Sequence, residues 1–128
     1  MKQNIFLSLF SVAVLFICTS FCVQAQSREG TVKPQKFERL MNKPNTVIID
    51  VRTPEEYNGG HIPGAINMDV NGGNFLHQIK SLDSTKKYLL YCRSGKRSES
   101  ALNIMRARGF PRVVHLKGGI EAWHGPKE

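Results

Sequence analysis

The feature that most constrains the fold of this chain is an alternation of short apolar runs with segments of helical periodicity. The runs are mainly apolar along their length, as in strands that are buried on both faces of a parallel sheet. They lie at residues 46–51, 88–91 and 113–116, with a brief further candidate at 65–67. This order predicts an α/β domain whose mostly parallel sheet is covered by helices on both faces.

Helix signals lie between the apolar runs. Thr53 is placed as an N-cap, Pro54 occupies the first helical position, and Glu56 completes a capping box. The longest helix is expected at 98–108, where the apolar side chains share one face and Gly109 ends the pattern. Shorter helices are expected from Pro34, around Phe75–Leu82, and after Gly118-Gly119, the last one carrying Trp123.

The first 25 residues have the features of a secretory signal peptide. Lys2 supplies a positive charge, residues 5–17 are almost wholly apolar, and Ala25 is a small residue at a candidate cleavage point. The alternative is an uncleaved membrane anchor, but the apolar stretch is shorter than the roughly 20 residues that a spanning helix needs. We therefore expect a signal peptide at 1–25, a flexible leader at 26–31 and a single domain at 32–126.

Cleavage after Ala25 would leave 128 − 25 = 103 residues and remove Cys18 and Cys22, so that Cys92 becomes the only thiol. We expect this mature domain in the periplasm, with membrane contact only through the signal segment before cleavage. An exported domain with one cysteine cannot form an internal disulfide. Its thiol is a liability in an oxidising compartment unless it is buried or used.

The chain is basic, with a formal net charge of +8. Its cations are mostly scattered, without a run of five or more, so no nucleic-acid groove is predicted. The one dense cluster, Arg93, Lys96 and Arg97, directly follows Cys92. This placement favours attraction of small anions to the cysteine.

The short polar loop after Cys92 has the composition of a nucleophile site. Gly95 permits backbone angles that other residues resist, so the loop can curl and point its N–H groups toward the sulfur. The N-terminus of the following helix and the nearby cations add positive charge. A free cysteine has a pKa of about 8.5, and such surroundings can bring it below neutrality. We therefore predict that Cys92 reacts as a thiolate next to a bound anion.

Two chemistries fit a nucleophilic cysteine in such a loop. Phosphate or arsenate chemistry needs an arginine six places after the cysteine, but Ser98 stands there and Arg97 is one place too early. Transfer of a sulfane sulfur needs room for only one extra atom, which the tight loop from Cys92 to Arg97 provides. The loop length therefore favours sulfur transfer over phosphate chemistry.

Three further residues are predicted to support the loop. Asp50 ends another predicted strand, so it should lie at the same edge of the sheet as Cys92. Asp50 and Arg52 are expected to hold the loops through an ion pair or hydrogen bonds. Ser98 either caps the following helix or contacts substrate. No metal site is expected, because three histidines lack the spacing of metal ligands relative to one another and to Cys92: His77, His115 and His124.

Three stretches of the chain resemble the rhodanese family. The first is IIDVRTPEEYNGGHIPGAINM at 48–68, similar to the family's Asp-Val-Arg segment followed by Glu-Tyr and Gly-His-Ile-Pro-Gly-Ala. The second is CRSGKRS at 92–98, similar to the active-site loops of single-domain sulfurtransferases. The third is GFPRVVHLKGGIEAW at 109–123, similar to the family's closing segment with Gly-Gly and a final tryptophan. The three stretches span residues 48–123, and the resemblance as a whole extends from about residue 32 to 123, nearly the whole mature chain.

The resemblance implies a rhodanese-like three-layer fold with a five-stranded, mostly parallel sheet. It implies an enzyme of the single-domain thiosulfate sulfurtransferase type, without a metal or organic cofactor. Cys92 would carry the sulfur as a persulfide, and the loop residues would bind the donor: Arg93, Ser94, Gly95, Lys96 and Arg97. The donor would be thiosulfate or a similar anion, and the acceptor a thiol or cyanide, including a protein thiol. The alternative is a sulfur carrier or redox-responsive binding module with little turnover of small molecules.

Overall fold

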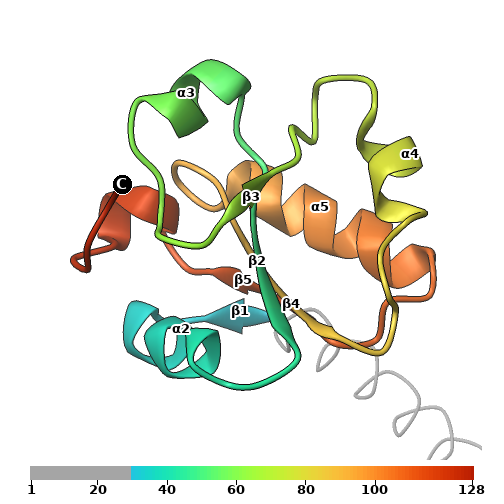
Figure 1. Cartoon of the computed structure of the whole chain (residues 1–128), viewed down its shortest axis with the longest axis horizontal. Coiled ribbons are helices and arrows are strands. Elements are labelled where there is room, and N and C mark those ends of the chain that lie inside the picture. The colour runs from blue at the N-terminus through green and yellow to red at the C-terminus, as the bar shows by residue number, and fades with distance from the viewer. Residues whose placement is uncertain (1–29) are drawn as a thin grey trace, which may run out of the picture.

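The central sheet has five strands in the order β1-β5-β4-β2-β3, and every neighbouring pair is parallel (Figure 1). The computed structural model describes residues 30–128. The strands are β1 Thr31–Val32, β2 Thr46–Asp50, β3 Ile66–Asn67, β4 Lys87–Tyr91 and β5 Val113–Leu116. The predicted α/β fold with a five-stranded sheet is confirmed.

Helices cover both faces of this sheet. They are α2 Pro34–Met41, α3 Pro54–Asn58, α4 Phe75–Ile79, α5 Lys96–Ala107 and the 3₁₀ helix η1 Gly119–Ala122. Elements α2 and η1 pack on one face, while α4 and α5 pack on the other. Element α3 lies beyond the carboxyl end of β2 (Figure 1). Its capping box is present as predicted, with Thr53 and Glu56 each accepting a hydrogen bond from the other's backbone N–H.

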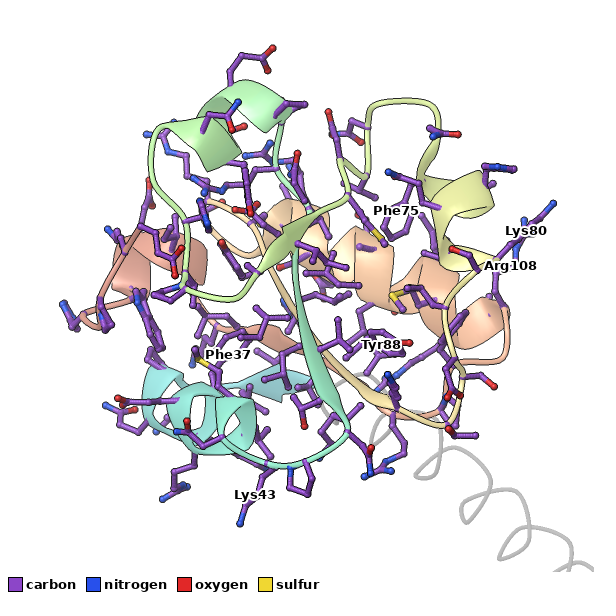
Figure 2. All side chains as sticks on the ribbon, viewed as in Figure 1. Phe37, Lys43, Phe75, Lys80, Tyr88 and Arg108 are labelled. Carbon is purple, nitrogen blue, oxygen red and sulfur yellow. The ribbon has the colours of Figure 1, made fainter. Side chains whose placement is uncertain are left out.

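The core has two halves because the strands are buried on both faces. Tyr88 and Leu90 of β4 pack toward α4 and α5, whereas Leu89 and Tyr91 pack toward α2 and η1. Figure 2 shows Phe37 directed from α2 to the sheet and Tyr88 lying on the side of α5. A run of consecutive buried residues, rather than an alternation, is the mark of a central parallel strand.

The expected flexible leader at 26–31 is wrong at its C-terminal end. Thr31 belongs to β1 and pairs with His115 of β5. Gly30 is buried, and its carbonyl accepts a hydrogen bond from the His115 backbone N–H at 2.6 Å. Because a two-residue edge strand has no internal periodicity, the sequence pattern could not reveal it. Residues 26–29 and the signal peptide expected at 1–25 lie outside the described part of the chain.

Two other boundaries differ from expectation. Helix α5 begins at Lys96, not Ser98, because Gly95 takes a left-handed φ of 106° and turns the chain two residues earlier. Helix α4 ends at Ile79, short of the expected Leu82, and its Leu76 is 44% exposed whereas Phe75 and Ile79 are buried. Within residues 30–128, no helix has the length and apolarity needed to cross a membrane.

Candidate active site

Cys92 lies directly after β4, at the carboxyl end of the strand between β5 and β2. Asp50, the last residue of β2, pairs in register with Tyr91, the residue before the cysteine. The prediction that Asp50 and Cys92 share one edge of the sheet is therefore confirmed. Functional groups commonly gather at this edge, because the loops that follow parallel strands converge there.

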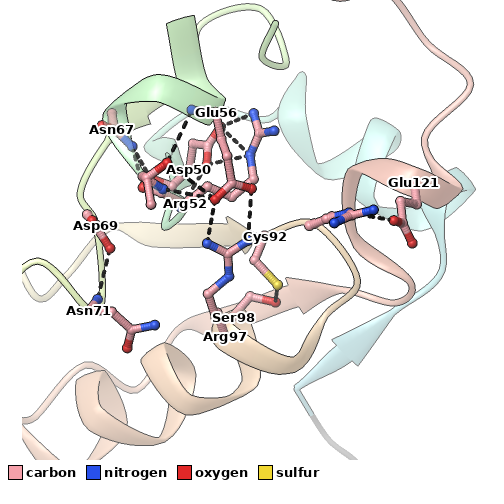
Figure 3. Close-up of polar contacts among 12 residues, drawn as sticks. Asp50, Arg52, Glu56, Asn67, Asp69, Asn71, Cys92, Arg97, Ser98 and Glu121 are labelled. Carbon is pink, nitrogen blue, oxygen red and sulfur yellow. Dashed lines mark hydrogen bonds and ion pairs between the residues drawn. The ribbon is translucent and has the colours of Figure 1, made fainter. Parts of the chain in front are cut away.

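The loop after β4 curls around the cysteine sulfur. The Gly95 N–H donates to Cys92 Sγ at 3.0 Å, and Ser98 Oγ lies 3.5 Å from the same sulfur (Figure 3). The positive φ of Gly95 makes this turn possible. As a result, Cys92 is only 1% exposed although its neighbours Arg93 and Ser94 are exposed.

The pKa of Cys92 lies below the ordinary value for a cysteine. Burial by itself would raise the pKa of the thiol, since it penalises the charged form. The opposing contributions are larger in sum, and the main ones are hydrogen bonds from the Ser98 hydroxyl and the backbone N–H groups of Ser98, Gly95 and Ser94. The thiolate is thus favoured chiefly by oriented hydrogen-bond donors.

Two of the three cations of the loop are paired with carboxylates. Arg93 Nε donates to Glu121 Oε1 at 2.8 Å on the surface. Arg97 forms a two-pronged pair with Glu56, with distances of 2.7 and 2.9 Å (Figure 3). Lys96 is exposed and has no ion pair among the described residues. Lys96 is therefore the cation of the loop whose charge stays open to solvent.

The predicted supporting pair Asp50 and Arg52 is built into the edge of the sheet. The Arg52 Nη2 donates to Asp50 Oδ2 at 2.7 Å, and Asp50 is fully buried. Arg52 also donates to the Gly60 carbonyl at 2.8 Å, which ties the segment after α3 to this edge. Asn67 donates to the backbone carbonyls of both residues (Figure 3). This arrangement orders the neighbouring loop, as predicted, and is separate from the hydrogen bonds to the sulfur.

The Gly118-Gly119 pair closes the far side of the loop. The Ile120 N–H donates to the Cys92 carbonyl at 2.8 Å, and the Glu121 N–H donates to the Arg93 carbonyl at 3.1 Å. Gly119 has a φ of 61°, and a Cβ there would collide with the Arg93 carbonyl. The sequence had marked this glycine pair as a helix start and as part of the closing segment that resembles the rhodanese family, but not as a contact of the loop. Its contact with the active-site loop depends on β5 lying next to β4.

His115 is a buried residue that the sequence reasoning had considered only as a metal ligand. Its Nδ1 lies 2.9 Å from Ser98 Oγ, and its Nε2 lies 3.0 Å from Thr31 Oγ1. Ser98 is itself fully buried and next to the Cys92 sulfur. The prediction that Ser98 caps the helix is wrong, since the N-cap of α5 is Gly95 and no side chain caps this end. The alternative, contact with substrate, stays a prediction, and the Ser98 hydroxyl lies beside the Cys92 sulfur.

A surface cavity of about 480 Å³ opens beside the loop. It lies between the segment after β2, the start of the Cys92 loop and η1. Charged side chains of both signs line it: Arg52, Glu56, Arg93, Glu121 and Lys127. The cavity gives a polar small molecule, or a side chain of a partner, a place to lie next to the loop.

The arrangement suits covalent chemistry at sulfur better than chemistry on a phosphoryl group. A thiolate held by N–H and hydroxyl donors can act as a nucleophile, and the same donors can hold a second sulfur atom. Arg97, the cation that stands closest in sequence to the oxyanion-binding position of a phosphatase loop, is engaged by Glu56. The residues around Cys92 thus favour sulfur transfer over phosphate chemistry, as the length of the loop does.

A family model, Rhodanese-like domain, matches residues 33–126 of the chain. Among solved structures, the Rhodanese-like domain of the Alr3790 protein from Anabaena sp., determined in solution, has a sequence 32% identical to that of this chain. That similarity covers 78% of this chain and 79% of the other, with a TM-score of 0.69. The residues matched by the family model include Cys92 and the loop after β4.

Two curated relatives have different names and lengths. A protein named Sulfurtransferase from Allochromatium vinosum is 33% identical over 69% of this chain and 82% of its own length. A tRNA uridine(34) hydroxylase from Pelagibacter ubique is 37% identical over 73% of this chain. The matched region spans only 31% of the hydroxylase, so the two proteins share this domain and not their whole length.

Proposed function

This chain belongs to the rhodanese-like domain family, and we propose that it is a sulfurtransferase that carries a sulfane sulfur on Cys92. Thiosulfate is the proposed donor, or another small anion with a terminal sulfur. A thiol or cyanide is the proposed acceptor, and a protein thiol belongs to the same chemical class. The hydrogen bonds that converge on the Cys92 sulfur from Gly95 and Ser98 carry this proposal.

The transfer divides into two displacements. The Cys92 thiolate attacks the terminal sulfur of thiosulfate, the S–S bond of the donor breaks, and sulfite leaves with the bonding electrons. Cys92 then holds the extra sulfur as a persulfide. The acceptor attacks the outer sulfur, and the Cys92 thiolate leaves, which restores the starting state. Splitting one transfer into two steps through a covalent intermediate is nucleophilic catalysis.

The burial of Cys92 supports a donor with an exposed, terminal sulfur. Because the side chain is 1% exposed, a bulky group around the transferable sulfur would not fit inside the loop. The exposed Lys96 at the start of α5 supports an anion, since it has no ion pair among the described residues. The remaining cations are held by Glu121 and Glu56 and would act mainly by shaping the loop.

We propose export to the periplasm for the same protein. The apolar segment at 5–17, preceded by Lys2 and followed by Ala25, supports this location. Cell fractionation, followed by N-terminal sequencing of the periplasmic protein, tests it. A mature chain that begins after Ala25 is expected, whereas a full-length chain that stays with the membrane would contradict cleavage.

Intact mass spectrometry tests the transfer itself. After incubation with thiosulfate and removal of excess donor, the chain should gain the mass of one sulfur atom, and cyanide should remove it. The Cys92→Ser variant should gain nothing, and in uncleaved protein, which keeps Cys18 and Cys22, a Cys18→Ser/Cys22→Ser variant should load normally. Loading that survives Cys92→Ser would refute the proposal.

A sulfur carrier with little turnover of small molecules is the second candidate function. The near-complete burial of Cys92 favours it, because a partner that opens the loop would then control sulfur release. A carrier should pass its persulfide to one protein thiol rapidly and to cyanide slowly. Rapid steady-state production of thiocyanate from thiosulfate and cyanide would decide against the carrier.

A further inference from the structure

A row of hydrogen-bonded groups runs from the Cys92 sulfur to the surface. It starts at Cys92 Sγ, passes through Ser98 Oγ at 3.5 Å and His115 Nδ1 at 2.9 Å from that oxygen, and ends at Thr31 Oγ1, 3.0 Å from His115 Nε2. The first three residues are buried, and Thr31 is exposed on the edge strand β1. Sequence separation hides this row, since His115 and Thr31 are 84 residues apart.

At the Ser98 hydroxyl the hydrogen bonds of the row can reverse their donor and acceptor roles. The hydroxyl has one proton but three neighbours that can take part in a hydrogen bond: Cys92 Sγ, His115 Nδ1 and the Gly95 carbonyl at 3.1 Å. A thiolate needs this proton, whereas a thiol can donate its own proton to the Ser98 oxygen. The nitrogen of His115 that faces Ser98 decides which arrangement is favoured.

We propose that His115 is a positioning residue that directs the Ser98 hydroxyl onto the ionised sulfur of Cys92. With its proton on Nδ1, His115 donates to Ser98 Oγ, and Ser98 then donates to the thiolate. The Nε2 of the same ring accepts a hydrogen bond from the Thr31 hydroxyl. A persulfide anion on Cys92 would use the same Ser98 donor, and this consequence alone rests on the proposed sulfurtransferase function.

The protons balance when the thiol ionises. In the thiol form, Cys92 donates to Ser98, Ser98 donates to Nδ1, and Nε2 donates to Thr31. In the thiolate form each of these hydrogen bonds is reversed. The two forms differ by one proton, which leaves the buried row at the exposed Thr31 end, and His115 changes tautomer while remaining neutral.

The surroundings of His115 support a neutral ring. Burial lowers the pKa of His115, since the imidazolium would lose solvation. The charged groups that face the ring are Glu99, which raises the pKa, and Arg106, which lowers it. Arg97 is the charged group that faces Cys92, and it is held by Glu56. A neutral imidazole can accept at one nitrogen and donate at the other, which the row requires.

Titration of the thiolate tests the role of His115 without any sulfur donor. Thiolate absorbance is followed against pH, and the spectrum of the Cys92→Ser variant is subtracted, so that the signal comes from Cys92 alone. His115→Leu should move the midpoint upward by about one pH unit, the size expected when a charged group loses hydrogen-bond support. His115→Asn, whose amide can still donate to Ser98, should recover most of the shift. His124→Leu, a control at an exposed histidine, should change nothing.

If His115→Leu folds and its midpoint stays within about 0.2 pH units of the parent, the proposal is overturned. Such a shift is far smaller than the one expected from the loss of a single hydrogen bond to a charged group. If His115→Leu does not fold, nitrogen NMR of His115 in the unmodified chain decides instead. The expected result is a neutral ring with Nε2–H below the thiol midpoint and Nδ1–H above it. An unchanged tautomer or an imidazolium would contradict it. If the His115 variants shift the thiolate midpoint as expected but the parent chain does not load sulfur, the sulfurtransferase function is refuted and the role of His115 stands.

Discussion

The segments after β2 and β4 end side by side at one edge of the sheet, yet they use their polar groups in opposite ways. After β2, Asp50 and Arg52 form a buried pair, and no buried polar side-chain atom of the described residues is left unpaired. After β4, the donors of the loop turn toward one sulfur atom, which gains a lowered pKa. The comparison separates a region that stabilises the edge from a region that prepares a nucleophile.

The largest expected effect comes from breaking the pair after β2. Arg52→Leu leaves the buried Asp50 carboxylate without its partner, which should lower the free energy of unfolding by about 3–5 kcal/mol. Urea unfolding measures this loss. Arg93→Leu, which removes a surface pair with 71% and 54% exposed side chains, is the control and should have little effect. Equal losses in the two variants would show that the β2 edge is not a special source of stability.

Substitution of Ser98 should show the opposite behaviour. Ser98→Ala removes a hydrogen bond to the sulfur, so the midpoint of thiolate formation should rise by about one pH unit. The free energy of unfolding should fall by about 1–3 kcal/mol, since His115 Nδ1 and the Gly95 carbonyl also lose their buried partner. Thiolate absorbance and urea unfolding measure the two effects. A large loss of stability without a change in the midpoint would assign Ser98 to the scaffold instead.

The Glu56–Arg97 pair joins the two regions, and its contribution should depend on pH. Hydrogen bonding to Arg97 lowers the pKa of Glu56 to about 2, from a reference value of 4.5. A carboxyl with a lowered folded-state pKa adds stability above its unfolded pKa and loses it as the pH falls. Because the pair is partly exposed, Glu56→Gln should cost only about 1 kcal/mol at pH 7.

Acid unfolding of the two chains checks this sign. The difference in stability between the parent and Glu56→Gln should be constant near neutrality and should shrink as the pH falls from about 4.5 to about 2. A difference that grows in acid would mean that the ion pair does not stabilise the folded state.

The smallest effect is expected at the exposed cation of the loop. Lys96→Ala should slow loading from thiosulfate about two-fold at low salt and less at high salt, because screening weakens an exposed charge. Stopped-time mass spectrometry measures the rate at both salt levels. Lys36→Ala, on the exposed face of α2, is the control for the loss of one charge. Equal slowing by Lys96→Ala at both salt levels would exclude a simple electrostatic role.

Local patterns were sufficient for most of the fold. The apolar residues of β4 and the capping box of α3 each depend on neighbours within a few positions, and both were predicted correctly. The strand β1 was missed because its two residues form a strand only through pairing with β5. The early start of α5 was missed because it depends on the backbone angle of Gly95.

The candidate site was predicted in outline. The position of Cys92 at a strand end and the curl of the loop follow from the residue order. The ion pairs of the cations could not be predicted from the residue order, since Arg97 pairs with a carboxylate that is 41 residues away in the chain. The contact between Ser98 and His115 could not be predicted either, because nothing near His115 in the sequence indicates which strand will lie next to it.

The sequence by itself determined the strands β2, β4 and β5, most of the turns, and that a polar loop with a cysteine ends a central strand. Those properties arise from interactions between residues close together in the chain. Only the tertiary structure decided that His115 and Thr31 lie beyond Ser98 and which charges are neutralised. These contacts depend on the order β1-β5-β4-β2, which places residues distant in sequence within hydrogen-bond distance.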